Sequence, residues 1–253
     1  MTQTIFPRAR LSAAPADIIK ALPGMARIMI NTRWGGATHE RMGVVETVTE
    51  ADGWLVCGGA EHASRIDPAM ITAVIVDRTS IMGGNPYPRV DFMLDDDEVL
   101  CSAISFAGLE PFDAALSPFG PGTELPLVER TPPSTAPAAA PAAQTEAKDP
   151  GCTPFEAALA SAQPVAVRIA RPGFAAEWVG IVEKVSPSRG FINVMRPDFH
   201  LHLKAGAVAG WRHETSGAET IMVALNGKGQ TTGLTVHGTA AAFASIPELA
   251  EIA

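Results

Sequence analysis

Positive charge is scarce in this sequence, which has 19 Lys and Arg residues against 27 Asp and Glu residues and a net charge of −8. Nucleic-acid binding depends on clustered Lys and Arg side chains that neutralise phosphates, so this balance argues against a nucleic-acid-binding protein. Apolar runs of the roughly 18 residues that a membrane-spanning helix needs are absent. The first residues also lack the apolar stretch of a secretory signal. We therefore expect a cytoplasmic protein without a membrane span.

Cysteine is also scarce, with Cys57, Cys101 and Cys152 as the three residues of this type. Their odd number and wide spacing fit neither a disulfide framework nor a C-x-x-C metal motif. We interpret them as three reduced thiols.

The motifs of common enzyme classes are missing as well. The sequence contains no G-x-S-x-G, no H-E-x-x-H and no pattern of a Cys–His nucleophile. Gly227-x-Gly229-xxx-Gly233 has the glycines of a dinucleotide loop, but it lies between two expected antiparallel strands. The acidic run Asp95–Glu98 lacks the spacing of an EF-hand, and we interpret it as a solvated turn. Nothing in the sequence demands an enzyme.

One stretch of the chain occurs twice. A shift of 137 residues lays Met42–Val56 (MGVVETVTEADGWLV) over residues 179–193 (VGIVEKVSPSRGFIN). The five identical positions are Gly43/Gly180, Val45/Val182, Glu46/Glu183, Val48/Val185 and Gly53/Gly190. Unrelated windows of this length share about one residue, so we interpret the match as an internal duplication.

Each copy has the pattern of a short helix followed by strands and tight turns. In the first copy we expect a loose arm over residues 1–15, a helix over Ala16–Leu22 and a short helix at Phe112–Leu116. The expected strands are Ala26–Thr32, Met42–Thr49, Trp54–Gly58, Met70–Val76, Val90–Leu94 and Val99–Phe106. Ile81–Arg89 is expected to form a long Gly- and Pro-rich hairpin loop.

The second copy repeats this plan after an expected helix at Pro154–Ser161. Its expected strands are Val165–Ala170, Trp178–Val185, Phe191–Met195, His200–Lys204, Val208–His213, Ile221–Leu225 and Gly233–Val236. The last two are predicted to form a hairpin across the two-residue turn Asn226-Gly227. Helices after Thr239 and near Ile246–Ile252 are expected to end the chain. The pattern predicts an α+β fold with two tandem repeats of antiparallel β-sheet and flanking short helices.

A Pro- and Ala-rich segment separates the two copies. It contains TPPSTAPAAAPAAQTEAKDP and has little to bury, so we expect an extended, semi-stiff linker. The predicted domains are a first repeat over residues 1–116, the linker over 117–153 and a second repeat over 154–253.

Three histidines are candidates for a site. His39 follows a Gly-Gly turn and precedes a strand, where an imidazole can ligate a metal while a neighbour such as Glu40 orients it. His200 and His202 are two residues apart on an expected strand, so both imidazoles point to the same face. They could form half of a metal site, line a pocket or be an ordinary pair on a sheet. The alternative for His39 is an exposed histidine without a role.

Two stretches of the chain resemble the HemS/ChuX/HutX haem-utilisation family. Ile18–Val48 is similar to the opening of a family repeat, through Leu22-Pro23, Thr32-Arg33, His39-Glu40 and Gly43. Gly190–Trp211 is similar to the single-repeat members, which have a His-x-His-Leu strand near the haem pocket. The resemblance implies two repeats that mimic the homodimer of the single-repeat members.

The resemblance also implies a ligand and a set of residues. It implies haem as the ligand and His39 as the axial ligand of the haem iron, with His200 and His202 in the pocket. The arginines considered for the distal side are Arg33, Arg65 and Arg212. The copies differ here, because His39 aligns with Ala176, and Ala63 and Arg65 align with the His-x-His pair. Any site is therefore asymmetric or has been lost.

Three functions follow as hypotheses. The first is a non-enzymatic haem carrier of iron acquisition, which exchanges haem with a donor or acceptor protein. The second is a haem-degrading enzyme, and the third is a degenerate repeat protein that binds another small ligand or a protein partner. Haem needs an apolar slot, an imidazole and cations for its propionates, and the residues near His39 and His202 can supply these groups.

Overall fold

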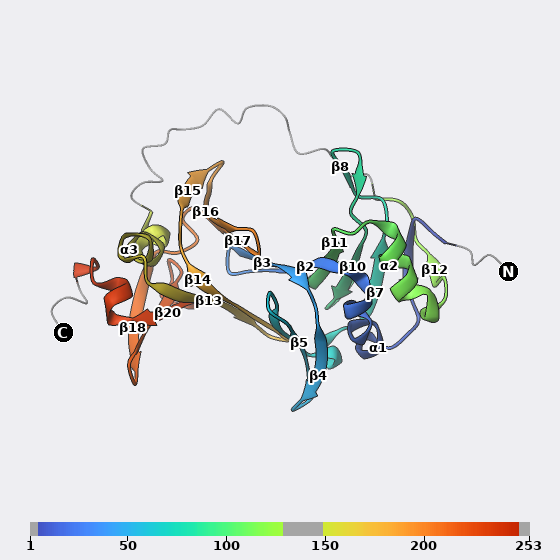
Figure 1. Cartoon of the computed structure of the whole chain (residues 1–253), viewed down its shortest axis with the longest axis horizontal. Helices are drawn as coiled ribbons and strands as arrows, with labels where there is room; N and C mark the ends of the chain where they lie inside the picture. Colours follow the sequence, from blue (N-terminus) through green and yellow to red (C-terminus); the bar gives the residue numbers. More distant parts are fainter. Residues whose placement is uncertain (1–4, 129–148, 248–253) are drawn as a thin grey trace. The chain divides into compact units, whose positions relative to one another are not determined.

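The computed structural model describes residues 5–128 and 149–247 and consists mostly of antiparallel strands with a few short helices (Figure 1). Its contacts divide the chain into two compact units. Unit 1 comprises Met1–Thr32, Glu40–Thr131 and Pro172–Ala175, and unit 2 comprises Arg33–His39, Pro132–Arg171 and Ala176–Ala253. The predicted α+β class with repeated antiparallel sheets is confirmed. The predicted domain boundaries at residues 116 and 154 stay a prediction.

The larger sheet of unit 1 has the strand order β12-β1-β7-β10-β11-β2-β3. Its strands are β1 (Arg8–Leu11), β2 (Arg27–Trp34), β3 (Ala37–Val44), β7 (Ala73–Asp77), β10 (Arg89–Met93), β11 (Val99–Ser105) and β12 (Thr123–Glu124). β10 pairs antiparallel with both β7 and β11. Fully buried Val76, Val90 and Phe92 show why these segments form central strands, since β-branched and aromatic side chains pack well on a pleated surface.

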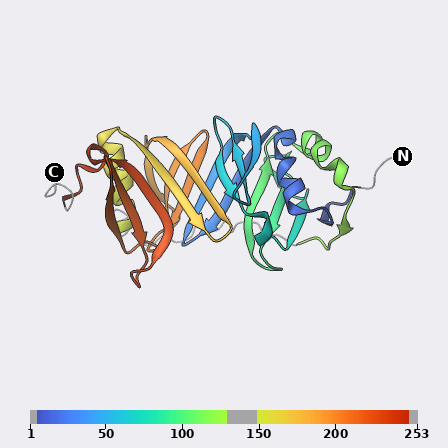
Figure 2. The ribbon, with the colours of Figure 1, turned by 90° about the horizontal axis from the view of Figure 1, so that it is seen from below.

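Short helices complete the core of unit 1. They are α1 (Pro15–Lys20), η1 (Leu22–Met25), η2 (Pro68–Met70), α2 (Leu109–Leu116) and η3 (Ser117–Phe119). Figure 2 shows α1 and α2 side by side. η1 packs closely on α2 at Gly24, where an added Cβ would lie 3.2 Å from the Cβ of Ala115. The buried Ile18, Leu22 and Phe112 supply the apolar surface of these helices.

A smaller sheet of unit 1 has the order β6-β5-β4 and contacts α1 and η1. Its strands are β4 (Thr47–Ala51), β5 (Trp54–Gly58) and β6 (Ala63–Ile66), and a separate two-stranded ribbon joins β8 (Ile81–Met82) to β9 (Asn85–Pro86). The predicted turn at Ala51–Gly53 is present, with positive φ at Asp52 and Gly53. This geometry suits the tight connection between β4 and β5.

Unit 2 also contains two groups of paired strands. One has the order β18-β19-β20-β13-β14 and the other the order β17-β16-β15. The strands are β13 (Pro164–Arg171), β14 (Phe174–Ile181), β15 (Val185–Ser188), β16 (Phe191–Arg196), β17 (Phe199–Lys204), β18 (Gly210–Ser216), β19 (Glu219–Leu225) and β20 (Thr231–Thr239). The helices η5 (Pro150–Cys152), α3 (Thr153–Ser161) and η6 (Ala240–Phe243) bury Phe155 and Phe243.

The strand bounds follow the shift of 137 closely. β13 and β14 begin and end 137 residues after β2 and β3. The tips of the β2–β3 and β13–β14 hairpins correspond in the same way. Residues 33–39, at the tip of the first, belong to unit 2, and residues 172–175, at the tip of the second, belong to unit 1. In unit 1 the amide of Asp67 donates to the carbonyl of Gly173 at 2.9 Å, and in unit 2 the amide of Lys204 donates to the carbonyl of Gly36 at 2.8 Å. The duplication therefore extends to single hydrogen bonds.

Some expectations about local structure were wrong. Residues 8–11 form β1, because their backbone groups pair with β7 and β12, so this part of the predicted loose arm is a strand. Residues 1–4 of the predicted arm lie outside the described residues. Met42–Thr49 and Trp178–Val185 are each broken into two strands. The break in the first copy occurs at Glu46, whose amide donates to the carbonyl of Gly58 and starts a new pairing.

The last hairpin also differs from the expectation. β19 and β20 are joined by residues 226–230, because the side-chain Oδ1 of Asn226 accepts from the amides of Lys228 and Gln230 and closes a longer turn. The predicted helix after Thr239 is present as η6. Most of the helix predicted near Ile246–Ile252 lies outside the described residues.

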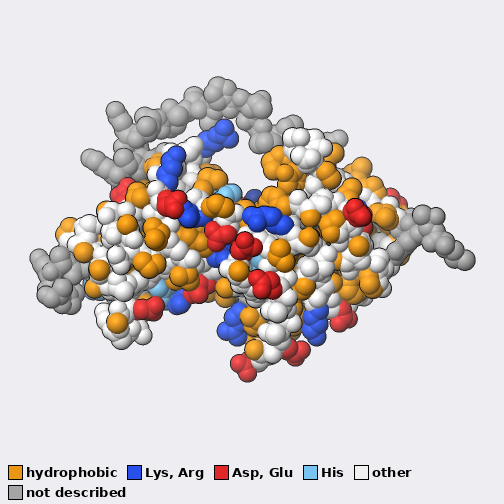
Figure 3. Space-filling view, viewed as in Figure 1, with side chains coloured by type: hydrophobic (Ala, Val, Ile, Leu, Met, Phe, Trp, Pro, Cys, Tyr) orange, Lys and Arg blue, Asp and Glu red, His pale blue; other side chains and the backbone are white. Residues whose placement is uncertain are grey.

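Within residues 5–128 and 149–247, no helix is long and apolar enough to cross a membrane. On the face shown in Figure 3, Lys and Arg side chains are interspersed with Asp and Glu side chains. The three cysteines are buried and none of them is in a disulfide, and burial raises the pKa of the Cys57 thiol to about 12. At neutral pH this thiol stays protonated and unreactive.

Candidate functional site

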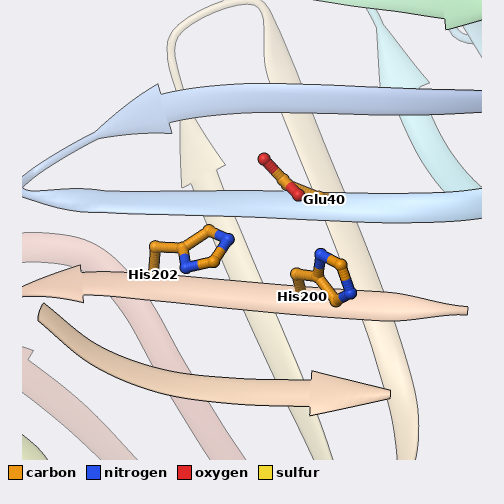
Figure 4. Close-up of side chains that lie close together, drawn as sticks. All are labelled: Glu40, His200 and His202. Carbon is orange, nitrogen blue, oxygen red and sulfur yellow. The ribbon is translucent and has the colours of Figure 1, made fainter. Parts of the chain in front are cut away.

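The candidate site is one face of the β16–β17 pair in unit 2, which we call the imidazole face. It consists of Phe191, Asn193 and Met195 on β16 and of His200, His202 and Lys204 on β17. Figure 4 shows the rings of His200 and His202 on β17. The two ring centroids are 5.8 Å apart, and both side chains are half-buried. The prediction that the two imidazoles share a face is therefore confirmed by the structure of this strand.

The imidazole face arises because successive side chains of β17 point to opposite sides of the strand. Phe199, Leu201 and Leu203 are fully buried, so the side chains between them project to the other side of the strand. On β16 the register places Met195 opposite His200, and Asn193 opposite His202. The apolar side chains of the face are exposed to solvent, by 39% for Phe191 and 51% for Met195. The result is two imidazoles flanked by apolar surface.

His202 is held in one orientation by Asn193. The side-chain Nδ2 of Asn193 donates to the carbonyl of Ser186 at 2.8 Å, so its Oδ1 is the group that faces His202 Nδ1, at 2.6 Å. An amide oxygen only accepts, and the proton of the neutral ring is therefore on Nδ1. Nε2 then carries the lone pair, which is the form of histidine that coordinates a metal.

His39 lies on the opposite side of β17 from this pair. Its ring meets Phe199 edge-on with 4.9 Å between ring centroids, and Phe199 in turn stacks on Trp178 at 4.6 Å. His39 Nε2 lies 3.3 Å from the carbonyl oxygen of Val167, to which it donates. The side chain has no exposed surface. The structure thus places His39 in the packed interior and does not bring it together with His200 and His202.

The three predicted arginines lie apart from one another. In unit 2 the carbonyl of Arg33 accepts from Nη1 of Arg171 at 3.2 Å, while the Arg33 side chain is exposed. Arg212 on β18 donates twice to Glu214 on the same strand. In unit 1 the guanidinium of Arg65 lies 5.3 Å from the ring centroid of Trp54. None of these three side chains belongs to the imidazole face.

Unit 1 has the counterpart of this face without imidazoles. The shift of 137 places Ala63, Arg65 and Asp67 at the positions of His200, His202 and Lys204. The register agrees, since Arg65 pairs with Val56 as His202 pairs with Asn193. The imidazole face is therefore a property of the second repeat alone, as the sequence asymmetry predicted.

A hollow of about 660 Å³ lies in unit 2 next to Lys204. Its walls come from the tip of the β2–β3 hairpin, the turn after β17 and the turn between β19 and β20. The residues that line it include Trp34, Gly36, Lys204, Ala207, Asn226 and Gln230. The hollow is thus adjacent to one end of the imidazole face.

Sequence reasoning missed part of this arrangement. Phe191, Asn193 and Met195 were placed on a strand but were not recognised as site residues. Their signal was weak: an exposed Phe or Met alternating with buried Ile192 and Val194 marks an open face only once the pairing with β17 is known. Trp34, which forms a wall of the hollow, was not recognised as a site residue either.

No protein-family model and no curated protein matches the sequence. Among solved structures, ChuS of Escherichia coli, described as a haem oxygenase, aligns with a TM-score of 0.70 and 16% identity over 92% of this chain and 83% of its own. Holo-PhuS of Pseudomonas aeruginosa, described as a haem-binding protein, aligns with a TM-score of 0.71 and 18% identity over 92% of this chain and 82% of its own.

The fold is that of ChuS and PhuS. The two matches span nearly the whole chain, so the HemS/ChuX-like architecture predicted from Ile18–Val48 and Gly190–Trp211 is confirmed. At identities of 15 to 18%, the likeness concerns the fold, and the residues of the site must be argued from this chain itself.

Proposed function

We propose that this protein is a haem carrier of iron acquisition that binds haem on the imidazole face of unit 2. The observation that carries the proposal is the grouping of two half-buried imidazoles with the exposed apolar side chains of Phe191 and Met195. Haem requires an imidazole for its iron and apolar surface for the porphyrin, and this face offers both. The fold shared with ChuS and PhuS, a haem oxygenase and a haem-binding protein, supports the same ligand.

His202 is the iron ligand in this proposal. Asn193 fixes its tautomer and orients the ring, as the partners of metal-bound histidines commonly do. His200 lies on the same face and is available to line the site or to act as a second ligand. His39 is a less suitable ligand in this structure, because coordination would require its ring to leave Phe199 and the carbonyl of Val167.

A haemin titration followed at the Soret band tests the proposal. We expect saturable one-to-one binding to the purified protein and a shifted Soret band in His202→Ala, with affinity lowered at least about tenfold, since an iron–ligand bond is lost. His213→Ala on β18 is the matched control and is expected to bind as the wild type does. A featureless, non-saturating titration of the wild type would overturn the proposal.

The second candidate is haem degradation, which the likeness to ChuS raises. Addition of ascorbate to the haem complex separates the two functions. A carrier keeps its Soret band under these conditions, whereas an enzyme loses it and forms an open-chain product. A haem-donating or haem-accepting protein, the expected partner of a carrier, would then be identified by the rate of haem exchange.

A further inference from the structure

His200 and His202 are close enough together to hold one metal ion without a porphyrin. A ring nitrogen of one lies within 4.8 Å of a ring nitrogen of the other, and in Figure 4 a nitrogen of His202 points toward the ring of His200. Two nitrogens bound to one tetrahedral ion at about 2.0–2.1 Å are roughly 3.4 Å apart. The χ2 torsion of histidine is broad, so small rotations of these two half-buried rings bring the nitrogens to that separation.

The strand pair holds the two rings at this spacing before any ion binds. β17 pairs with β16 from Phe199 to Lys204, so no part of the strand between the two histidines is free to bend. On the other side of β17, Leu201 and Leu203 are fully buried and fix which face the imidazoles occupy. Ligands on such a rigid element lose little conformational freedom on binding, and this preorganisation strengthens the binding of an ion.

Asn193 prepares His202 for a metal. Its Oδ1 accepts the Nδ1 proton of His202 at 2.6 Å, while its own Nδ2 donates to the carbonyl of Ser186 at 2.8 Å. The ring is thereby oriented, and its Nε2 carries the lone pair. Histidines that coordinate metals commonly donate their other ring nitrogen in this way.

The type of ligand selects the class of ion. Neutral imidazoles suit zinc, copper and nickel, whereas calcium and magnesium require oxygen ligands. Phe191 and Met195 beside the pair are partly exposed, so water or another small ligand has room to complete the coordination. We propose that His200 and His202 chelate a divalent zinc, copper or nickel ion in the haem-free protein.

A chelated ion would exclude haem from the same face. Nε2 of His202 has one lone pair, so it cannot bind the chelated ion and the haem iron at the same time. Metal loading therefore lowers the apparent affinity for haem and regulates the proposed site. This competition rests on the proposed haem binding at His202, whereas the metal site does not depend on it.

A titration of the haem-free protein with zinc, in competition with a chromophoric chelator, tests the metal site. Loss of an outer-shell partner alone weakens metal binding by about tenfold to hundredfold, so we expect His200→Ala and His202→Ala each to weaken it by at least about a hundredfold. Asn193→Leu, which removes the outer-shell partner, is expected to weaken it by about tenfold. His213→Ala on β18 is the matched control and should bind zinc as the wild type does. Wild-type affinity in His200→Ala or in His202→Ala would overturn the site.

Haemin titrations at rising zinc concentrations test the competition. We expect the apparent haemin affinity of the wild type to fall by about tenfold when free zinc is ten times its own dissociation constant. His200→Ala keeps His202 and is expected to bind haemin without inhibition by zinc. Zinc binding through both histidines that leaves haemin binding unchanged would overturn the competition.

The two titrations separate this inference from the proposed function. If the wild type binds zinc through both histidines but binds no haemin, the metal site stands and the proposed function is overturned. If it binds haemin but no zinc, the proposed function stands and this inference is overturned.

Discussion

At the scale of single residues, the histidines show how burial decides chemistry. His202 is half-buried and has its proton placed by Asn193, so it can act as a ligand. His62 in unit 1 and His237 in unit 2 are buried, and burial lowers the pKa of both. Their positive neighbours Arg41 and Arg168 lower the pKa further. These two histidines therefore stay neutral and contribute to the packing.

His62 predicts a dependence of stability on pH. Its pKa in the folded state is lower than the value of about 6.5 expected in the unfolded chain, so the unfolded state takes up the proton first on acidification. The stabilisation is complete above about pH 6.5 and is lost as the pH falls below that value toward the pKa of the folded state. Phenylalanine occupies the equivalent position, Phe199, in the second repeat.

We expect His62→Phe to reduce the fall in melting temperature between pH 7 and pH 5, measured by differential scanning fluorimetry. Part of the decrease in melting temperature is expected to remain, because His237 is still present in this variant. A melting temperature that falls equally with pH in the two proteins would contradict this explanation.

At the scale of elements, the sequence predicted strands better than their ends. Strands with clear alternation, such as Phe191–Met195 and His200–Lys204, were predicted to within one residue. Met42–Thr49 was not, because Val45 is fully buried and continues the apolar pattern through the point where the chain changes partner. Alternation with a period of two shows which side chains of a strand share a face. Which strand it pairs with, and where the chain changes from one pairing strand to another, depend on hydrogen bonds to residues distant in sequence.

The same limit applies to the site. The sequence predicted that His200 and His202 share a face, which follows from their spacing alone. It did not predict that His39 lies on the other side of β17, because that requires the contact with Phe199, 160 positions away in numbering. The hollow was not predicted either, since its walls come from three turns.

The aromatic layer beneath β17 gives a prediction at this scale. Phe199 is fully buried between Trp178 and His39. We expect Phe199→Ala to lower the free energy of unfolding by about 3–5 kcal/mol, the usual loss for a buried Phe. Chemical denaturation followed by tryptophan fluorescence measures it, and a loss below about 1 kcal/mol would show that the layer is not packed as described.

At the scale of the whole molecule, each unit includes a hairpin tip from the other half of the sequence. Unit 2 needs residues 33–39, because Gly36 accepts from Lys204, and His39 packs on Phe199. A chain cut within the linker therefore does not separate two self-sufficient domains. The duplication has produced repeats that complete one another.

Fragments test this interdependence. We expect residues 149–253 alone to show a lower melting temperature and weaker near-UV dichroism than the same fragment mixed with residues 1–128. The two fragments together should regain most of the signal of the intact chain. An isolated second half as stable as the intact chain would show that residues 33–39 contribute little to unit 2.

The central claim is that an imidazole at position 202 binds the haem iron, and chemical rescue tests it most directly. His202→Gly removes the ring, and free imidazole is then added to the haemin complex of this variant. We predict that the Soret spectrum of His202→Gly differs from that of the wild type and returns to it with added imidazole, while His39→Ala matches the wild type throughout. A wild-type spectrum in His202→Gly without imidazole, or a spectrum altered only in His39→Ala, would contradict the account.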